Sequence, residues 1–82
     1  MVRTGFDDDF KKAIKKIKDG LLKIKVKKII KKIIAVPEIG KPMQYGRKDT
    51  REVYMQPFRI SYKYHKEEDR IEFLEIYHKD EQ

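Results

Sequence analysis

The sequence predicts an α+β fold in which an N-terminal antiparallel helical hairpin, at about residues 7–35, packs on a small antiparallel sheet of three to four strands at about residues 51–78. Two patterns predict it: apolar residues recur every three or four positions in the first half, and every second position in the second half. The length of 82 residues suits a single domain over residues 1–82, without room for a second core.

The first predicted helix begins at the acidic run Asp7–Asp9, which is typical of an N-cap followed by acidic first-turn residues. The Asp19–Gly20 pair indicates its end, with Gly20 in the left-handed position after the helix. A second helix is expected from about Leu21 to just before Pro37, because a residue that precedes proline is disfavoured in the α conformation. The short connection predicts an antiparallel pair. The apolar stripe of the first helix consists of Phe10, Ala13, Ile14 and Ile17, and that of the second of Leu22, Val26, Ile29, Ile30 and Ile33.

The second half reads as strands. Met1–Phe6 is either an additional edge strand or a frayed tail, and Glu38–Thr50 is expected to be a loop because it contains glycines, a proline and several polar residues. Clean alternation of apolar and polar residues predicts a strand over Phe58–Tyr64, and the three predicted strands follow one another in a meander. The predicted strands are Arg51–Gln56, Phe58–Tyr64 and Arg70–His78.

Composition excludes several classes of protein. The chain has no cysteine, which rules out a disulfide scaffold, a Cys-ligated zinc site and a thiol nucleophile. Its longest apolar run, Ile33–Pro37, is far shorter than the roughly 20 residues that span a membrane. Residues 1–10 lack the apolar core of a signal peptide, so a cytoplasmic protein without membrane contact is expected.

The positive charge is concentrated in the predicted hairpin. Residues 1–35 hold 12 basic and 4 acidic residues, a net charge of +8, whereas residues 36–82 hold 9 basic and 10 acidic residues, a net charge of −1. The eleven lysines between Lys11 and Lys32 either form a solvated helix surface or bind nucleic acid through its phosphates. A membrane-surface helix is disfavoured because both apolar stripes are needed for the core. A base-reading helix is disfavoured because the second helix offers no Asn, Gln or Arg.

Two arginines of the predicted sheet are candidates for binding a phosphate. Arg59 lies on the polar face of its strand, and Arg51 lies at the start of the preceding strand. An arginine pair on adjacent strands can grip a phosphate through two hydrogen bonds. The alternative is that both pair with acidic residues of neighbouring strands, for which the candidates are Glu52, Glu72 and Glu75.

Histidine and tyrosine side chains have two interpretations each. His78, in the last strand, is either a general acid or base or an ordinary surface residue. His65 is interpreted as a turn residue. Tyr54, Tyr62 and Tyr77 fit a pleated surface, and each could also stack on a nucleic-acid base.

Four segments in order resemble the RelE/ParE toxin superfamily: Gly40–Met43 (GKPM), Arg51–Tyr54 (REVY), Phe58–Tyr62 (FRISY) and Ile76–Lys79 (IYHK). Its members are the toxins of two-component toxin–antitoxin systems. The resemblance implies a RelE-like fold and a cognate antitoxin as partner. RelE-like members cut messenger RNA in the ribosomal A site, and ParE-like members poison DNA gyrase.

The resemblance implies a ribosome-dependent endoribonuclease that acts on messenger RNA without a metal or other cofactor. Alternatives are a gyrase-inhibiting ParE-like toxin and an inactive member that only binds its antitoxin. Matching positions imply that Arg59 stabilises the phosphate, that His78 acts as the acid, and that Arg51 supplies a further basic group. Lys41, Lys48 and Glu52 are candidates for the general base. The lysines expected to contact nucleic acid are Lys27, Lys28, Lys31, Lys41, Lys48 and Lys79.

Overall fold

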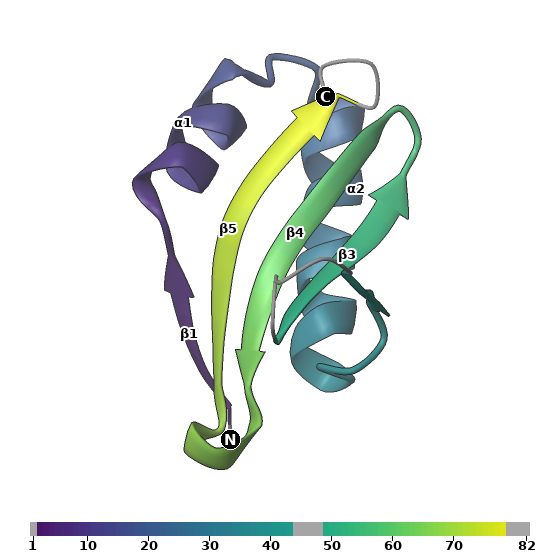
Figure 1. Cartoon of the computed structure of the whole chain (residues 1–82). Coiled ribbons are helices and arrows are strands. Elements are labelled where there is room, and N and C mark those ends of the chain that lie inside the picture. The colour runs from purple at the N-terminus through teal and green to yellow at the C-terminus, as the bar shows by residue number, and fades with distance from the viewer. Residues whose placement is uncertain (1, 44–48, 79–82) are drawn as a thin grey trace.

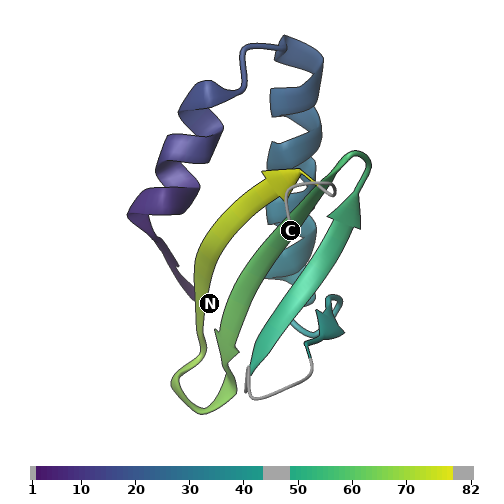
Figure 2. The ribbon, with the colours of Figure 1, turned by 45° about the horizontal axis from the view of Figure 1, so that its top comes forward.

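The computed structural model describes residues 2–43 and 49–78, and in them two helices lie on one face of a single sheet (Figures 1 and 2). We call this the helix-facing side of the sheet and the opposite side the outer face. No helix of the described residues covers the outer face. In chain order the elements are β1 (Arg3–Phe6), α1 (Asp8–Lys16), α2 (Gly20–Ala35), β2 (Lys41–Pro42), β3 (Thr50–Met55), β4 (Phe58–His65), a 3₁₀ turn (Lys66–Glu68) and β5 (Arg70–His78).

The sheet has five strands in the order β1-β5-β4-β3-β2 and is mixed, because β1 runs parallel to β5 while the other neighbours are antiparallel. The predicted antiparallel sheet of three to four strands was therefore wrong in strand number and direction. The β1 strand is short and contains Gly5, so it carries little alternation. The β2 strand lies inside the predicted loop and has only two residues, one of them Pro42, which suits an edge.

The helix boundaries correct one prediction. The α1 helix ends at Lys16, and Ile17 is already extended. The Asp19 side chain, instead of marking the end of α1, is the N-cap of α2 and accepts hydrogen bonds from the backbone N–H groups of Leu21 and Leu22 at 2.9 and 3.4 Å. Gly20 is the first residue of α2 and does not occupy the predicted left-handed position. The Asp19 carboxylate instead accepts hydrogen bonds from backbone N–H groups that have no partner within the first turn of α2.

The end of α2 at Ala35, before Pro37, confirms the predicted stop. Neither helix in the described part of the chain is long and apolar enough to cross a membrane.

The core fills the space between the two helices and the helix-facing side of the sheet. A register shift in the β4–β5 pairing takes Ser61 opposite Glu75 and Tyr62 opposite Phe73, so Leu74 has no partner. This bulge lets both Phe73 and Ile76 face the helices despite their odd spacing. The buried apolar residues are Phe10, Ile17, Val26, Ile33, Met55, Ile60, Tyr62, Ile71, Phe73 and Ile76.

Hydrogen bonds from the Tyr62 hydroxyl to Pro37 and Gly40 hold the chain between α2 and β2, and we call this arrangement the Pro37–Gly40 lock. The fully buried Tyr62 donates its hydroxyl proton to the carbonyl oxygen of Pro37 at 2.7 Å and accepts the backbone N–H of Gly40 at 2.9 Å. A Cβ at Gly40 would lie 2.6 Å from that hydroxyl oxygen, so only glycine fits there. Arg51 adds hydrogen bonds to the carbonyl oxygens of Glu38 and Gly40, at 3.1 and 2.8 Å.

Candidate functional site

The outer face carries a polar cluster around Arg59. The β3 and β4 strands are joined by a turn of two residues, which places Tyr54 directly opposite Arg59. On the other side of β4, Arg59 lies opposite Tyr77 of β5. Cross-strand partners share a face of the sheet. Since the next pair of this register, Ile60 and Ile76, faces the helices, the row Tyr54–Arg59–Tyr77 lies on the outer face.

Glu52 joins this row into a connected cluster. The Arg59 Nη1 atom donates to Glu52 Oε1 at 3.0 Å, and the Tyr77 hydroxyl donates to Glu52 Oε2. The guanidinium carbon of Arg59 lies 5.8 Å from the centre of the Tyr54 ring, within the range of a cation–π contact. Lys41 of β2 pairs with Glu52 and therefore lies on the same face. We call Lys41, Glu52, Tyr54, Arg59 and Tyr77 the outer-face cluster.

Partial burial strengthens the interactions of the cluster. The side chain of Glu52 is 16% exposed and that of Arg59 31%, so their ion pair is less screened by water than a surface pair. Burial raises the pKa of the Tyr77 hydroxyl above its usual value of 10, and the hydrogen bond to Glu52 raises this pKa further. The phenol is therefore protonated at neutral pH and able to donate a proton.

Arg51 does not belong to this cluster. It pairs with Tyr62 across β3 and β4, and Tyr62 lies in the core, so Arg51 lies on the helix-facing side. Its recorded hydrogen bonds hold the backbone of Glu38 and Gly40. The expected grip of one phosphate by Arg51 and Arg59 is therefore not formed, because the two side chains leave the sheet on opposite faces.

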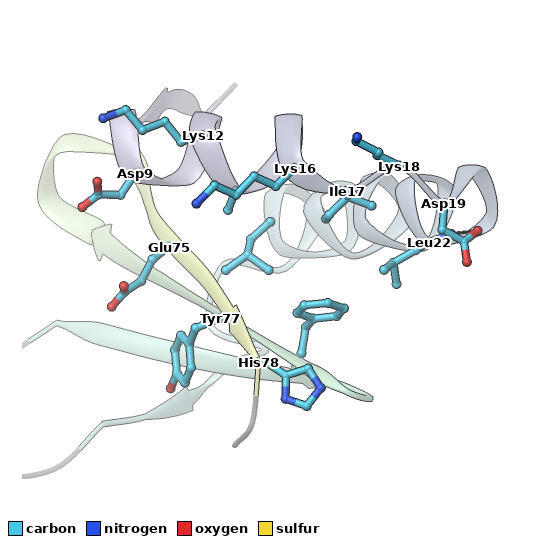
Figure 3. A pocket seen from close by; sticks show the side chains of 13 residues that line it. Asp9, Lys12, Lys16, Ile17, Lys18, Asp19, Leu22, Glu75, Tyr77 and His78 are labelled. Carbon is cyan, nitrogen blue, oxygen red and sulfur yellow. Dashed lines mark hydrogen bonds between the residues drawn. The ribbon is translucent and has the colours of Figure 1, made fainter. Parts of the chain in front are cut away.

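His78 also lies away from Arg59. It pairs with Phe58, with the two ring centres 5.5 Å apart and the rings edge to face. Both line a groove of about 530 Å³ between the helices and the end of β5 (Figure 3). Three lysines and three acidic residues also line this groove, so their charges balance and do not favour an anion there. They are Lys12, Lys16, Lys18, Asp9, Asp19 and Glu75.

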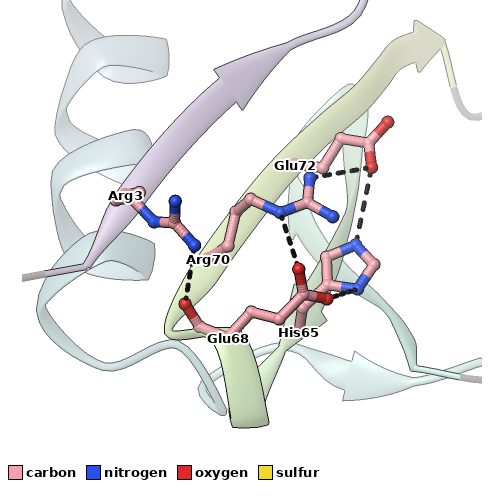
Figure 4. Close-up of polar contacts among 5 residues, drawn as sticks. All are labelled: Arg3, His65, Glu68, Arg70 and Glu72. Carbon is pink, nitrogen blue, oxygen red and sulfur yellow. Dashed lines mark hydrogen bonds and ion pairs between the residues drawn. The ribbon is translucent and has the colours of Figure 1, made fainter.

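At the opposite end of the β4–β5 hairpin, His65 is part of an ionic network (Figure 4). Its ring nitrogens lie 3.7 Å from Glu68 and 3.5 Å from Glu72, and Arg70 lies 3.8 and 3.6 Å from the same two carboxylates. Arg3 of β1 donates to the carbonyl oxygen of Glu68 at 3.2 Å. These contacts connect β1 to the 3₁₀ turn. His65, which was interpreted as a turn residue, is the last residue of β4 and pairs with Arg70, directly before that turn.

The lysines predicted to contact nucleic acid occupy different surfaces. Three lie exposed on α2, on the far side of the sheet from Arg59, and Lys41 lies exposed in the outer-face cluster. Lys48 and Lys79 lie outside the described residues. The three on α2 are Lys27, Lys28 and Lys31. Among the predicted site residues that are described, the structure thus brings together only Arg59, Glu52 and Lys41.

Sequence reasoning did not place Tyr54 and Tyr77 beside Arg59. The signal for Tyr54 was present, because a turn of two residues at Gln56–Pro57 puts Tyr54 opposite Arg59 by counting. Tyr77 was harder to place. Its position opposite Arg59 depends on the bulge at Leu74, which no pattern in the sequence predicts.

Comparison with known proteins agrees with this fold. The model of the family described as "ParE toxin of type II toxin-antitoxin system, parDE" matches residues 2–82. No curated protein matches the chain significantly by sequence.

Solved structures of RelE toxins and their complexes share the architecture. A chain of the intact Escherichia coli RelBE toxin–antitoxin complex superposes with a TM-score of 0.81 at 18% identity, covering 100% of both chains. The isolated E. coli RelE toxin gives 0.82 at 15% identity, over 100% of this chain and 88% of that one. The RelBE2 complex of Mycobacterium tuberculosis gives 0.78 at 18% identity, over 94% and 96%. The family match and the shared architecture together show that the chain belongs to the ParE toxin family, within the RelE/ParE superfamily of type II toxin–antitoxin systems.

Proposed function

We propose that this toxin is a RelE-like endoribonuclease that cuts messenger RNA on the ribosome and thereby inhibits translation. The observation that carries the proposal is the outer-face cluster, in which a carboxylate, a guanidinium and a protonated phenol meet on a face that no described helix covers. These are the three kinds of group that cleavage of an RNA strand by its own 2′-hydroxyl requires.

Each group has a role in that reaction. The Glu52 carboxylate takes the proton of the 2′-hydroxyl, whose oxygen forms a bond to the adjacent phosphorus. Arg59 stabilises the negative charge that develops on the phosphate oxygens, and the recorded ion pair with Glu52 uses only its Nη1 atom. The bond to the 5′-oxygen then breaks, and this leaving oxygen takes the Tyr77 proton. Tyr77 is thus a nearer proton donor to Arg59 than the expected His78.

A cognate antitoxin is the proposed protein partner. Solved structures with this fold include toxin–antitoxin complexes from Escherichia coli, Mycobacterium tuberculosis and Methanococcus jannaschii. The exposed edge of β1 can accept an added strand, and the basic helices favour a partner with acidic segments. The ribosome and messenger RNA would be the partners of the free toxin.

A second candidate function is inhibition of DNA gyrase without nuclease chemistry. The ParE family match over residues 2–82 favours it. The Glu52–Arg59 ion pair also favours it, since the carboxylate neutralises the cation that an RNA phosphate would need.

The two functions can be separated in a translation extract. We expect the protein to cut the message and Arg59→Ala to reduce cleavage by about 100-fold or more, the usual effect of removing one transition-state donor. Lys66→Ala is the matched control, because Lys66 is an exposed cation in the 3₁₀ turn, remote from Arg59. Intact message together with gyrase–DNA cleavage complexes would refute the nuclease proposal and support the second function.

A further inference from the structure

The structure distinguishes among the three tyrosines that could stack on a base. Tyr62 is fully buried and committed to the Pro37–Gly40 lock. Tyr77 is half-buried and hydrogen-bonded to Glu52. Tyr54, on the outer face, is 51% exposed and is the most exposed of the three. An aromatic ring presented to solvent beside a cation is the arrangement that proteins use to hold unpaired bases.

The position of Tyr54 relative to Arg59 sets which base it can reach. The ring centre is 5.8 Å from the guanidinium carbon, and the two residues lie directly opposite on neighbouring strands. A phosphate bound by Arg59 therefore brings an attached nucleoside within reach of the Tyr54 ring. Lys41, on the same face beside Glu52, supplies a second positive charge for the backbone of the strand.

We propose that Tyr54 is a base-stacking residue, which binds a nucleobase of single-stranded RNA next to the phosphate held by Arg59. The inference rests on the proposed nuclease function for its ligand. Duplex RNA does not fit, because its bases are stacked on one another and are not free to cover a tyrosine ring. Every base has a flat face, so this contact provides affinity with little sequence preference.

A different role for Tyr54 would be to orient Arg59 through the cation–π contact alone. In that case loss of the ring weakens the grip on the phosphate whether or not a base is present. Stacking predicts that loss of the ring matters only when the ligand has bases. The two roles therefore separate when the protein variant and the ligand are changed in turn.

The test uses the full chain and two labelled single-stranded oligonucleotides, with binding followed by fluorescence anisotropy at low salt. One is a run of 2′-fluoro-adenosines, which lack the attacking hydroxyl, and the other is an abasic backbone of the same length. We expect Tyr54→Leu to weaken binding of the adenosine strand by about 5- to 150-fold, the range for one stacked base, and to leave the abasic strand unchanged. Tyr54→Phe, which keeps the ring, should bind both strands like the parent.

Equal weakening of both strands by Tyr54→Leu would overturn the inference, and so would the absence of any weakening. Failure of the parent to prefer the adenosine strand would overturn it as well. None of these measurements needs cleavage. If the protein leaves messenger RNA intact but passes this test, the nuclease proposal fails and the stacking proposal stands.

Discussion

Removing the Tyr62 hydroxyl should show how much the Pro37–Gly40 lock contributes to the free energy of unfolding. Tyr62→Phe keeps the buried ring in place but removes the acceptor of the Gly40 N–H and the donor to the Pro37 carbonyl. Gly40 is buried, so its N–H is left without a partner or access to water, which costs about 1–3 kcal/mol. The Pro37 carbonyl is half-buried and can recover part of its hydrogen bond from water. We therefore expect the free energy of unfolding to fall by about 2 kcal/mol.

Equilibrium unfolding in urea, followed by far-ultraviolet circular dichroism, measures this loss. With a slope of about 1 kcal/mol per molar urea, at the low end for small proteins, the midpoint should fall by about 2 M. Tyr64→Phe is the matched control, because Tyr64 is half-buried on the same strand and side and has no recorded hydroxyl hydrogen bond among the described residues. A loss for Tyr62→Phe no larger than that for Tyr64→Phe would refute the role assigned to the lock.

Two further predictions concern the helix start and the buried phenols. Asp19→Ala should lower the free energy of unfolding by about 1 kcal/mol and the melting temperature by several degrees in calorimetry, because α2 loses its N-cap, whereas Asp19→Asn should keep most of it. Burial raises the pKa values of Tyr62 and Tyr77 above 10 in the folded state, so the stability they contribute is complete below pH 10 and is lost as the pH rises through the folded values. The free energy of unfolding, measured with urea from pH 8 to pH 11, should therefore fall less steeply with pH for Tyr77→Phe than for the parent. Equal dependence on pH in the two proteins would contradict the raised pKa of Tyr77.

The helices and the long strands could be predicted because their signals are local. The apolar stripe of α2 and the proline that follows it define that helix, alternation defines β4, and β5 is a long apolar-rich segment after a polar turn. The edge strands could not be predicted in the same way. The β1 strand is specified by its pairing with the distant β5, and β2 by its pairing with β3, so neither depends on a pattern within its own residues.

The site could be predicted only in part, for a related reason. Arg59 was identified from its strand and from the family resemblance, but whether Arg51 accompanies it depends on register. Counting back from the two-residue turn puts Arg51 opposite Tyr62 and Tyr54 opposite Arg59, and these two pairs lie on opposite faces. The pairing of Arg59 with Glu52 confirms, for Arg59, the alternative that the sequence also offered. The same counting removes Arg51 and adds Tyr54 as a neighbour of Arg59.

The structure also separates charges that the sequence groups together. The basic helices lie on one side of the sheet and Arg59 on the other. In the proposed nuclease, an RNA strand held by Arg59 would therefore cross a face on which Lys41 is the only described lysine of those predicted to contact nucleic acid. That face also carries Lys63, which follows Arg59 by four residues on β4, so in the proposed nuclease the RNA backbone would have Lys63 as well as Lys41 within the same face. The lysines of α2 face away from this strand. In the proposed function, their excess of charge would attract a second partner, ribosomal RNA or an acidic antitoxin, while the outer-face cluster would carry out the chemistry.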